Sequence, residues 1–459
     1  MRRSPSPSRS HALVIGGGIA GLVTSHVLLR HCKRVTLVER DIYPAEPVFR
    51  SGVPQGQQVH TLLLRGQHVL EELFPGLTQK LLAAGAIGRE YGSGSLYVSP
   101  YGPLCQIPPR LHGWNCSRLF LEWHLLQEVR HSDRITVVEG AEVVGLLGEK
   151  QQGQIDGVRY LKRGQAAPQE VHADLIIDAS GALSQAPIWL EQLGYQAPQE
   201  TVVAIHQWYA TRWYASPVPD AIPWNGVIVR ASPPLRRDGV LMEVEGGRWM
   251  VILSGRGEDA PPTDEAAFLA FAQSLSDPTI ARAIQAGQPC SPMDSYCRTH
   301  IQWRHFERLS SGPQNFLVLG DAACVLNPVY GQGMTIAILE AVLLDRCLRQ
   351  QDHGALARVF QRQQAHLLRR PWQYAERAER LLAGNNTETN WGSRIVRQYI
   401  ETLMHLVTID PRASLIFQEY LHMLRSSRSF LHPYLVKQVL RLWVKKWRHG
   451  REQRALAQE

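Results

Sequence analysis

The stretch His11–Arg40, HALVIGGGIAGLVTSHVLLRHCKRVTLVER, decides the fold of this chain. It opens with a short apolar run, ALVI, which predicts a buried strand, and the glycine motif Gly16-x-Gly18-x-x-Gly21 follows at once. The pattern turns helical from Leu22, and a second apolar run, VTLV, predicts a parallel strand. Glycines in such a turn let bare backbone approach a pyrophosphate, and the helix attracts phosphates through its free first-turn N–H groups. The stretch therefore predicts a βαβ unit that binds a dinucleotide.

Glu39 indicates which kind of dinucleotide fits. It ends the second strand, 18 residues beyond Gly21. An acidic side chain at this distance can bind a ribose 2′-hydroxyl, and its charge would repel a 2′-phosphate. We therefore expect an unphosphorylated ribose, as in FAD or NAD. The alternative is an ordinary glycine-rich turn, but the strand before it, the helix after it and the acid beyond it favour a dinucleotide site.

The composition of the 459-residue chain is that of an ordinary globular protein, with 44% hydrophobic and 20% charged residues. Its seven cysteines form no CxxC pair, which indicates reduced thiols and a cytoplasmic location. Cys297, His300 and His305 lack a fourth neighbouring ligand, so we expect no metal site. Because no run of 18 apolar residues occurs, no segment is long enough to span a bilayer.

Further helices and strands can be placed around the first unit. We expect a helix over about 61–73, and another, SRLFLEWHLLQEVR, with Ser117 as its N-cap. Three apolar runs predict strands that return to the nucleotide sheet: 135–138, 141–147 and 173–177.

Residues 201–254 change to long alternating segments, which predict an antiparallel sheet. This region carries six large aromatic residues, and a sheet face rich in rings would make an apolar pocket wall. Plain core packing is the alternative for each ring. The six are Trp208, Tyr209, Trp213, Tyr214, Trp224 and Trp249.

A second glycine-rich segment lies near residue 330. The apolar run NFLVL leads into Gly320-Asp321, and NPVYGQGM, residues 327–334, opens a long apolar helix. The full glycine motif with its distant acid is not repeated here, so the sequence holds one complete dinucleotide site.

Together these motifs resemble those of the FAD-dependent monooxygenases of the p-hydroxybenzoate hydroxylase fold. The resemblance covers roughly residues 11–350, and its third motif is the central Asp178-Ala-Ser-Gly181. It implies an α/β fold with a Rossmann-like FAD-binding domain, an interleaved antiparallel-sheet substrate domain and a C-terminal helical region. We place a disordered arm at 1–10, the FAD-binding domain at 11–80, 115–195 and 300–360, the substrate domain at 81–114 and 196–299, and the helical region at 361–459.

The resemblance also implies roles for single residues. Glu39 and Arg40 would hold the adenosine ribose, Arg118 the phosphate or ribose region, Val143 the adenine, and Asp321 the ribityl chain. The N–H groups of residues 331–334 would face the N1–C2=O edge of the flavin and stabilise its reduced anion. The residues expected to contact the cofactor are Gly16, Gly18, Ala20, Gly21, Glu39, Arg40, Arg118, Val143, Asp178, Gly320, Asp321, Gly331, Gly333 and Met334.

No single catalytic residue can be assigned. The candidates expected beside the isoalloxazine ring are Pro54, Gln55, Gly56, His60, Pro328 and Gly331. A surface turn is the alternative for residues 53–60.

The implied reaction is that of a monooxygenase. Reduced FAD combines with O2 to give a C4a-hydroperoxide, whose distal oxygen hydroxylates or epoxidises a lipophilic or aromatic small molecule of secondary metabolism. NAD(P)H would donate the electrons, either directly or through a separate flavin reductase, because residues 182–185 lack the arginines that many relatives place there. Two alternatives stay open, an isoprenoid-type reductase of the same fold and a flavin-binding redox sensor without turnover. The Trp-x-Trp-x-Ile-Pro signature of flavin halogenases is absent.

The C-terminal tail carries the basic character of the chain. Residues 425–454 hold nine Lys/Arg and one Glu, a net charge of +8 that equals that of the whole chain. An apolar stripe lies opposite a basic one, which predicts an amphipathic helix. We favour packing of the apolar stripe on its own domain over contact with an anionic membrane surface, and we expect no nucleic-acid binding because no reading motif accompanies the charge. The apolar residues are Val436, Val439, Leu440, Trp443 and Trp447, and the basic ones are Lys437, Arg441, Lys445 and Arg448.

Overall fold

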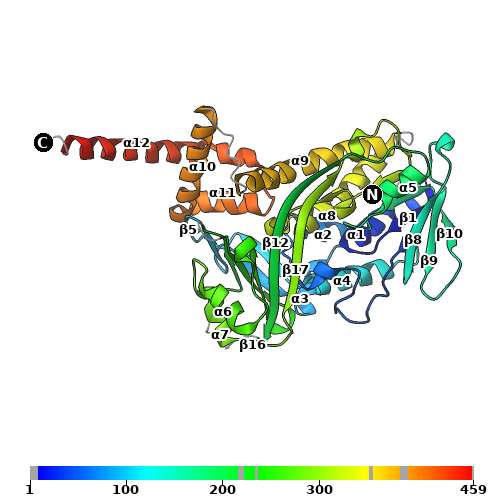
Figure 1. Cartoon of the computed structure of the whole chain (residues 1–459), viewed down its shortest axis with the longest axis horizontal. Helices are drawn as coiled ribbons and strands as arrows, with labels where there is room; N and C mark the ends of the chain where they lie inside the picture. The colour runs from blue at the N-terminus through cyan, green and yellow to red at the C-terminus, as the bar shows by residue number, and fades with distance from the viewer. Residues whose placement is uncertain (1–8, 216–221, 233–235, 351–354, 383–390, 457–459) are drawn as a thin grey trace.

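The computed structural model describes residues 9–215, 222–232, 236–350, 355–382 and 391–456. Figure 1 shows two main parts with a group of helices at the C-terminal end: a layered α/β part around β1, and a part built on the long strands β12 and β17.

The expected parallel sheet is present. It has five strands, each pairing in parallel with its neighbours. Their order is β18 (Phe316–Val318), β11 (Leu175–Asp178), β1 (Arg9–Ile15), β2 (Cys32–Val38) and β7 (Ile135–Val138). Because β1 begins at Arg9, the last two residues of the expected disordered arm belong to a strand, and the rest of that arm lies outside the described residues.

Alternate residues of β1 face two different layers. Ala12 and Val14 pack in the core made with helices α1 (Ile19–Leu28), α4 (Arg118–Arg130) and α8 (Gly333–Arg349). Leu13 and Ile15 pack in the core on the other face, which includes residues of β8 and β9. Both faces of the sheet are covered, and the buried parts of its central strands are mostly apolar, such as Ala12–Ile15 of β1 and Leu175–Ile177 of β11.

One expected strand lies in a different sheet. Residues 141–147 form β8 (Ala141–Leu147), which pairs with β9 (Gly157–Lys162) and not with the nucleotide sheet. With β10 (Gln169–His172) these make an antiparallel three-stranded layer over the second face. An apolar run predicts a buried strand but not its partner, so the prediction of its sheet was wrong.

The helices of the first part begin close to their expected positions. α1 starts directly after Gly18, one turn before the expected Leu22, and ends at Leu28. Ser117 caps α4, because its hydroxyl accepts the Phe120 N–H at 3.1 Å. The remaining elements here are η1 (Pro54–Gln57), α2 (Leu64–Leu73), α3 (Leu77–Ala83) and α5 (Ala186–Gln192).

The second large sheet confirms the antiparallel prediction for residues 201–254. It contains nine strands, and all its neighbouring pairs are antiparallel except β13 with β4. Along the main path the order is β19 (Cys324–Val325), β17 (Asp294–Arg304), β12 (Glu200–Ala215), β15 (Arg248–Arg256), β14 (Asp238–Val244), β13 (Gly226–Val229), β4 (Leu96–Ser99) and β5 (Gly102–Pro103), with β16 (Gln288–Pro289) beside β12. The expected domain boundary at 299/300 falls inside β17, so it does not separate two structural elements.

Helices α6 (Glu265–Gln273) and α7 (Thr279–Ala286) contribute Phe268, Phe271 and Ile280 to the core on one face of this sheet. A separate two-stranded sheet, β3 (Ile87–Tyr91) with β6 (Leu111–Asn115), completes this part.

Four helices follow: α9 (Leu356–Leu382), α10 (Trp391–Ile409), α11 (Pro411–Leu421) and α12 (Pro433–Leu456). α9 begins five residues before the expected boundary at 361 and packs on the second sheet through Leu368 and Trp372. The distal end of α12 projects away from the body (Figure 1). Within the described residues, no helix is long and apolar enough to cross a membrane.

Candidate functional site

One cavity of about 1350 Å³ joins the two parts of the molecule. Its wall runs from the glycine loop before α1, past the start of α8, to the strands of the second sheet and to helices α10 and α11. Ligand pockets for small molecules are typically ~300–1,000 Å³, so this cavity has room for two ligands end to end.

The cavity gathers most of the predicted cofactor residues. Those that line it are Gly16, Gly18, Ala20, Glu39, Arg40, Arg118, Val143, Asp321, Gly331, Gly333 and Met334. Gly21, Asp178 and Gly320 do not line it. Among the candidates for the flavin ring, Pro54, Gln55, His60, Pro328 and Gly331 line the cavity, whereas Gly56 is buried against Leu119 of α4.

The three glycines of the first motif are required for different reasons. Gly16 has a φ of +92°, and a Cβ there would lie 2.7 Å from the Ala179 carbonyl oxygen. A Cβ on Gly21 would lie 1.8 Å from the Gly16 carbonyl oxygen, so this glycine lets the helix pack on the turn. A Cβ on Gly18 would meet no atom within 4 Å, and the φ of this residue is −74°. No protein atom would clash with a side chain at Gly18, so the protein alone does not require glycine here. The empty space beside Gly18 fits a ligand that approaches the bare backbone.

Glu39 lies at the end of β2 beside this turn. Its carboxylate accepts the N–H groups of Gly17 at 2.6 Å and Asp41 at 2.9 Å. Arg50 lies 3.1 Å from Glu39 and also contacts Asp41 and Glu122, each at 2.8 Å. Burial alone would lower the pKa of Arg50, but Glu122 and Glu39 raise it above the ordinary arginine value. This buried cluster holds the acid of the motif at the cavity wall.

Arg118, the first residue of α4, also faces the cavity. Its guanidinium lies 3.8 Å from Glu122, and its buried Nε has no hydrogen-bond partner among the described residues. A buried donor without a partner is rare in folded proteins, which fits a ligand oxygen at this position. Arg40 at the same end donates to the Gly52 carbonyl oxygen at 2.9 Å.

Asp178 occupies a different place from the one expected. It is fully buried and accepts hydrogen bonds from the Ser180 N–H and the Ser184 hydroxyl, so it shapes its own loop. The cavity wall at this motif consists instead of Ala179, Ser180 and Gly181. The motif was located correctly, but its carboxylate points into its own turn because aspartate readily bonds backbone N–H groups two residues on.

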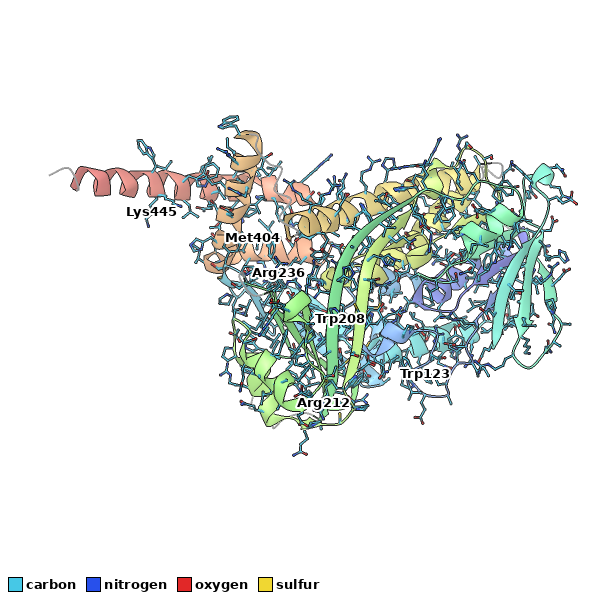
Figure 2. The ribbon with its side chains drawn as sticks, in the orientation of Figure 1. Trp123, Trp208, Arg212, Arg236, Met404 and Lys445 are labelled. Atoms are coloured by element: carbon cyan, nitrogen blue, oxygen red, sulfur yellow. The ribbon has the colours of Figure 1, made fainter. Side chains whose placement is uncertain are left out.

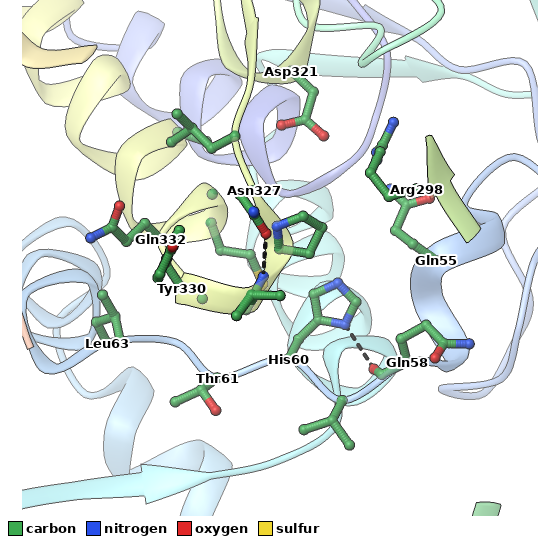
Figure 3. A pocket seen from close by; sticks show the side chains of 18 of the residues that line it. Gln55, Gln58, His60, Thr61, Leu63, Arg298, Asp321, Asn327, Tyr330 and Gln332 are labelled. Atoms are coloured by element: carbon green, nitrogen blue, oxygen red, sulfur yellow. Dashed lines mark hydrogen bonds between the residues drawn. The ribbon is translucent and has the colours of Figure 1, made fainter. Parts of the chain in front are cut away.

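The Gly320-Asp321 turn follows β18. Gly320 has a φ of +64° and packs toward Ala20, while Asp321 faces the cavity (Figure 3). Burial raises the pKa of Asp321 above the ordinary value, and Arg298 and Arg118 partly oppose that rise. Glu340 of α8 supports the turn, because its carboxylate accepts the Gly320 N–H at 2.5 Å.

The start of α8 is open toward the cavity. Gly331 has a φ of +63°, and a Cβ on Gly333 would meet no atom within 4 Å. The helix has no side-chain cap and no acidic residue in its first turn, so its first N–H groups remain available to a ligand. Before it, Asn327 holds the short helix η7 (Pro328–Tyr330) by accepting the Val329 N–H at 3.0 Å.

His60 lies across the cavity from this helix start (Figure 3). Its Nδ1 is 2.8 Å from the Gln58 carbonyl oxygen, and since a carbonyl only accepts, Nδ1 carries the proton. Burial and the positive charge of Arg118 lower the pKa of His60 to about 3, so the ring is neutral and Nε2 is an acceptor. Gln58 is fixed in turn by the Thr211 hydroxyl, which donates to its side-chain oxygen at 2.6 Å.

The aromatic wall of the cavity differs from the one expected. Of the six aromatic residues in 201–254, only Tyr209 lines it. Tyr214 and Trp249 lie in the core beneath α6 and α7, and Trp208 is 45% exposed on the outer face (Figure 2). The rings that line the cavity come from many elements: Tyr91, Tyr97, Trp189, Tyr209, Tyr296, Tyr330, Tyr374, Phe417, Tyr420 and Phe430.

Several of these wall residues could not be found from the sequence. Arg298 lines the cavity from β17, and the C-terminal helices add Leu403 and Met404. The alternation in β17 places Tyr296 and Arg298 on one face, and this could be predicted from the sequence. Nothing in the sequence indicates that this face lines the cavity near the glycine loop. Among the described residues no group of His, Cys, Asp and Glu could hold a metal ion.

Comparison with known proteins identifies the family. A family model described as an FAD binding domain matches residues 9–358, which is most of the chain. The chain belongs to this FAD-binding family. It is 30% identical over 353 residues to Protein Rv3254 of Mycobacterium tuberculosis, covering 75% of this chain and 74% of that one. The flavoprotein is also 23% identical over 348 residues to squalene monooxygenase of Mus musculus, covering 73% of this chain and 54% of that enzyme.

Solved structures agree on the fold. The flavin-dependent brominase Bmp2 superposes with a TM-score of 0.60 at 16% identity, covering 84% of this chain and 93% of that one. The expected p-hydroxybenzoate hydroxylase type of fold and the expected FAD are therefore confirmed, and the flavoprotein is an FAD-dependent oxidoreductase. The open space at Gly18, the free Nε of Arg118 and the open start of α8 fit this cofactor.

Proposed function

We propose that this flavoprotein is a monooxygenase that transfers one oxygen atom from O2 to a lipophilic or aromatic small molecule, by hydroxylation or epoxidation, in secondary metabolism. The observation that carries the proposal is the large cavity, which is continuous from Gly18 to the tyrosines of the second sheet. A cofactor bound at its glycine end reaches toward a chamber lined by rings and tyrosine hydroxyls. The name of the squalene monooxygenase relative supports the same class of reaction.

FAD, when bound, supplies the redox chemistry and the reaction with O2. The residues of this chain do the rest of the work. The turn at Gly18 and the start of α1 would hold the phosphates of FAD, and the uncapped N–H groups at the start of α8 would be available to its flavin end. His60 keeps its proton on Nδ1 and offers Nε2 as an acceptor toward the cavity. The apolar wall excludes water from the reacting groups.

We propose NAD(P)H as the source of electrons, used directly or through a separate flavin reductase. The cavity wall after the central motif consists of Ala182, Leu183 and Gln185, so these residues offer no cation for the phosphates of NADPH. Anaerobic mixing of the FAD-loaded protein with NADPH separates the two routes. Bleaching of the flavin absorbance supports direct reduction, and bleaching only after a flavin reductase is added supports the second route.

Oxygen uptake tests the monooxygenase proposal. With reductant and an extract of candidate metabolites, we expect O2 consumption coupled to a product that is heavier by one oxygen atom. A saturated product formed without O2 would identify the isoprenoid-type reductase instead. A product that requires bromide or chloride would identify a halogenase, and flavin that cycles without any product would identify a redox sensor.

A further inference from the structure

Arg89 of β3 is a buried cation for which the described residues supply no carboxylate partner. The residue is 7% exposed and lines the cavity on the side of the second sheet. Its Nη1 donates to the Asn115 side-chain oxygen at 3.1 Å, and its guanidinium lies 4.5 Å from the centre of the Tyr91 ring. Its Nε has no hydrogen-bond partner, and no ion pair among the described residues involves it. The guanidinium therefore retains an unused donor and an uncompensated charge.

Three other arginines on the cavity wall are paired with carboxylates, whereas the Nε atoms of Arg118 and Arg298 also lack a hydrogen-bond partner among the described residues. Arg50 contacts Glu122, Arg230 contacts Asp238 and Arg256 contacts Glu379. Taking a charge out of water is costly unless an opposite charge and hydrogen bonds replace the solvent. Arg89 is more than nine-tenths buried, so its missing counter-charge is expected from a molecule that enters the cavity.

Among the described residues, the surroundings of Arg89 add hydrogen-bond donors and no acidic side chain. The Asn115 side-chain nitrogen is a second buried donor without a partner. His422 packs against Tyr91 at 4.2 Å between ring centres, and burial lowers the pKa of His422 to about 3, so this ring is neutral. Gly226 makes room, because a Cβ there would lie 2.3 Å from the Arg89 Nη2. This cluster has the composition of an anion subsite with an aromatic wall.

We propose that Arg89 binds an anionic group of the substrate, and that the substrate is an aromatic or lipophilic organic acid. A carboxylate matches the planar fork of a guanidinium and accepts two parallel hydrogen bonds from it. The inference rests on the proposed function only in treating this chamber as the substrate chamber. Arg89 lies on β3, which pairs with β6 in a separate sheet from the one that carries the glycine loop, so we assign it to the substrate and not to the phosphates of FAD.

Equilibrium dialysis of the FAD-loaded protein with 2-naphthoate and 2-naphthamide tests the proposal, because the two probes share a ring system and differ in charge. We expect the wild-type protein to bind the acid at least about tenfold more tightly than the amide, as a charge-assisted pair provides. Arg89→Met should abolish this preference and leave amide binding within about twofold. Arg110→Met, at an exposed arginine in the loop before β6, is the matched control and should keep the preference.

A wild-type protein without preference for the acid would overturn the proposal, and so would an Arg89→Met protein that keeps the preference. Thermal unfolding adds a second readout. Removing an unpaired buried charge should raise the melting temperature, whereas loss of a structural cation would lower it. A lowered melting temperature together with an unchanged acid preference would make Arg89 structural. Dialysis requires neither O2 nor reductant, so its outcome is independent of whether the protein transfers oxygen.

Discussion

At Gly18 it is the cofactor, and not the surrounding protein, that requires glycine. Gly18→Val should abolish FAD binding while the fold remains, because its Cβ would enter space that no protein atom occupies. Flavin content after purification and far-UV circular dichroism measure the two effects. The control is Gly145→Val on β8, where a Cβ also meets nothing within 4 Å but the position does not line the cavity. A folded Gly18→Val protein with full flavin content would contradict the assignment.

Asp321 should contribute to the affinity for FAD. Its carboxylate makes no hydrogen bond to another described residue, and η6 (Gly320–Ala322) has no side-chain cap, so a role as a turn cap is not supported. Asp321→Ala should weaken FAD binding by about 1.5–3 kcal/mol through loss of a charge-assisted hydrogen bond. Titration of the apoprotein with FAD measures this. A change in Kd below about twofold would favour a purely local role.

At the residue scale, the sequence predicts local chemistry better than long-range contacts. Gly16, Gly21 and Glu39 could be found because the motif fixes their separations along the chain. Arg50 could not, although it joins Glu39 to Glu122, because these residues become neighbours only after folding. Asp178 shows the opposite case, in which the motif was found but its carboxylate bonds its own loop.

At the scale of elements, periodicity predicts a strand but not its partner. β8 was expected in the nucleotide sheet and pairs with β9 instead, since an apolar run fits either layer. The aromatic stretch on β12 shows the same limit. Its alternation puts Trp208 and Tyr209 on opposite faces, and only the structure shows that Tyr209 faces the cavity.

Helix α8 should make the stability of the protein depend on pH through Glu340. Burial raises the pKa of Glu340 to about 7 in the folded protein, against 4.5 for the free group. Between these values the folded state retains a proton that the unfolded state has lost, so stability falls as pH rises and then levels off. The loss in the free energy of unfolding amounts to about 3 kcal/mol between pH 4.5 and 7.

Urea unfolding at pH 5 and pH 8 tests this. The difference in the free energy of unfolding between the two pH values should be smaller for Glu340→Gln than for the wild type. An equal difference would show that Glu340 does not titrate in this range.

Glu379 of helix α9 should stabilise the loop before α8, because it bonds Asn327 of that loop. Glu379 is buried, pairs with Arg256 of β15, and accepts the Asn327 side-chain N–H at 2.8 Å. Breaking such a pair leaves an uncompensated buried charge, so Glu379→Ala should destabilise the protein by about 3–5 kcal/mol. Denaturant unfolding measures this. The control is Glu376→Ala, which breaks a pair with the mostly exposed Arg380 and should cost below about 1 kcal/mol. Equal destabilisation by the two variants would contradict the proposed role of Glu379 in stabilising this loop.

At the scale of the whole molecule, the C-terminal helices complete the cavity that the first two parts begin. Tyr374 of α9, Leu403 of α10 and Phe417 of α11 all line it. The family match ends at residue 358, so these helices lie outside the part of the chain that identifies the cofactor. The sequence predicted helices here but not their contact with the substrate chamber, because amphipathic helices give the apolar face without the surface that it covers.

The first half of the basic helix α12 packs on its own domain, as expected. Leu435 and Val439 are buried against α10 and α11, and the Trp443 indole donates to the Thr402 hydroxyl at 2.8 Å. Further along, Leu440, Val444 and Trp447 are 50%, 49% and 60% exposed, and Lys445 lies beyond the body of the molecule (Figure 2). Leu440 was expected to pack, but half of its surface is exposed, and the side chain of Arg448 lies outside the described residues.

We propose that this exposed half of α12 contacts an anionic membrane surface, where exposed apolar residues and nearby lysines act together. The cavity wall includes Val396 and Ile400 of the adjacent α10, and both are exposed, so such contact would bring a lipophilic substrate close to the cavity.

Full-length protein should pellet with phosphatidylserine vesicles at low salt and be released at high salt, since screening weakens the attraction. A triple variant, Leu440→Gln, Val444→Gln and Trp447→Gln, should stay in the supernatant and remain folded. The control replaces Ile42, Val144 and Val202, which are similarly exposed elsewhere, and should pellet like the wild type. Truncation after Leu431 would be a poor test alone, because it removes Leu435 and Val439 from their core. If the wild type stays in the supernatant with anionic vesicles at low salt, the exposed residues do not serve membrane contact.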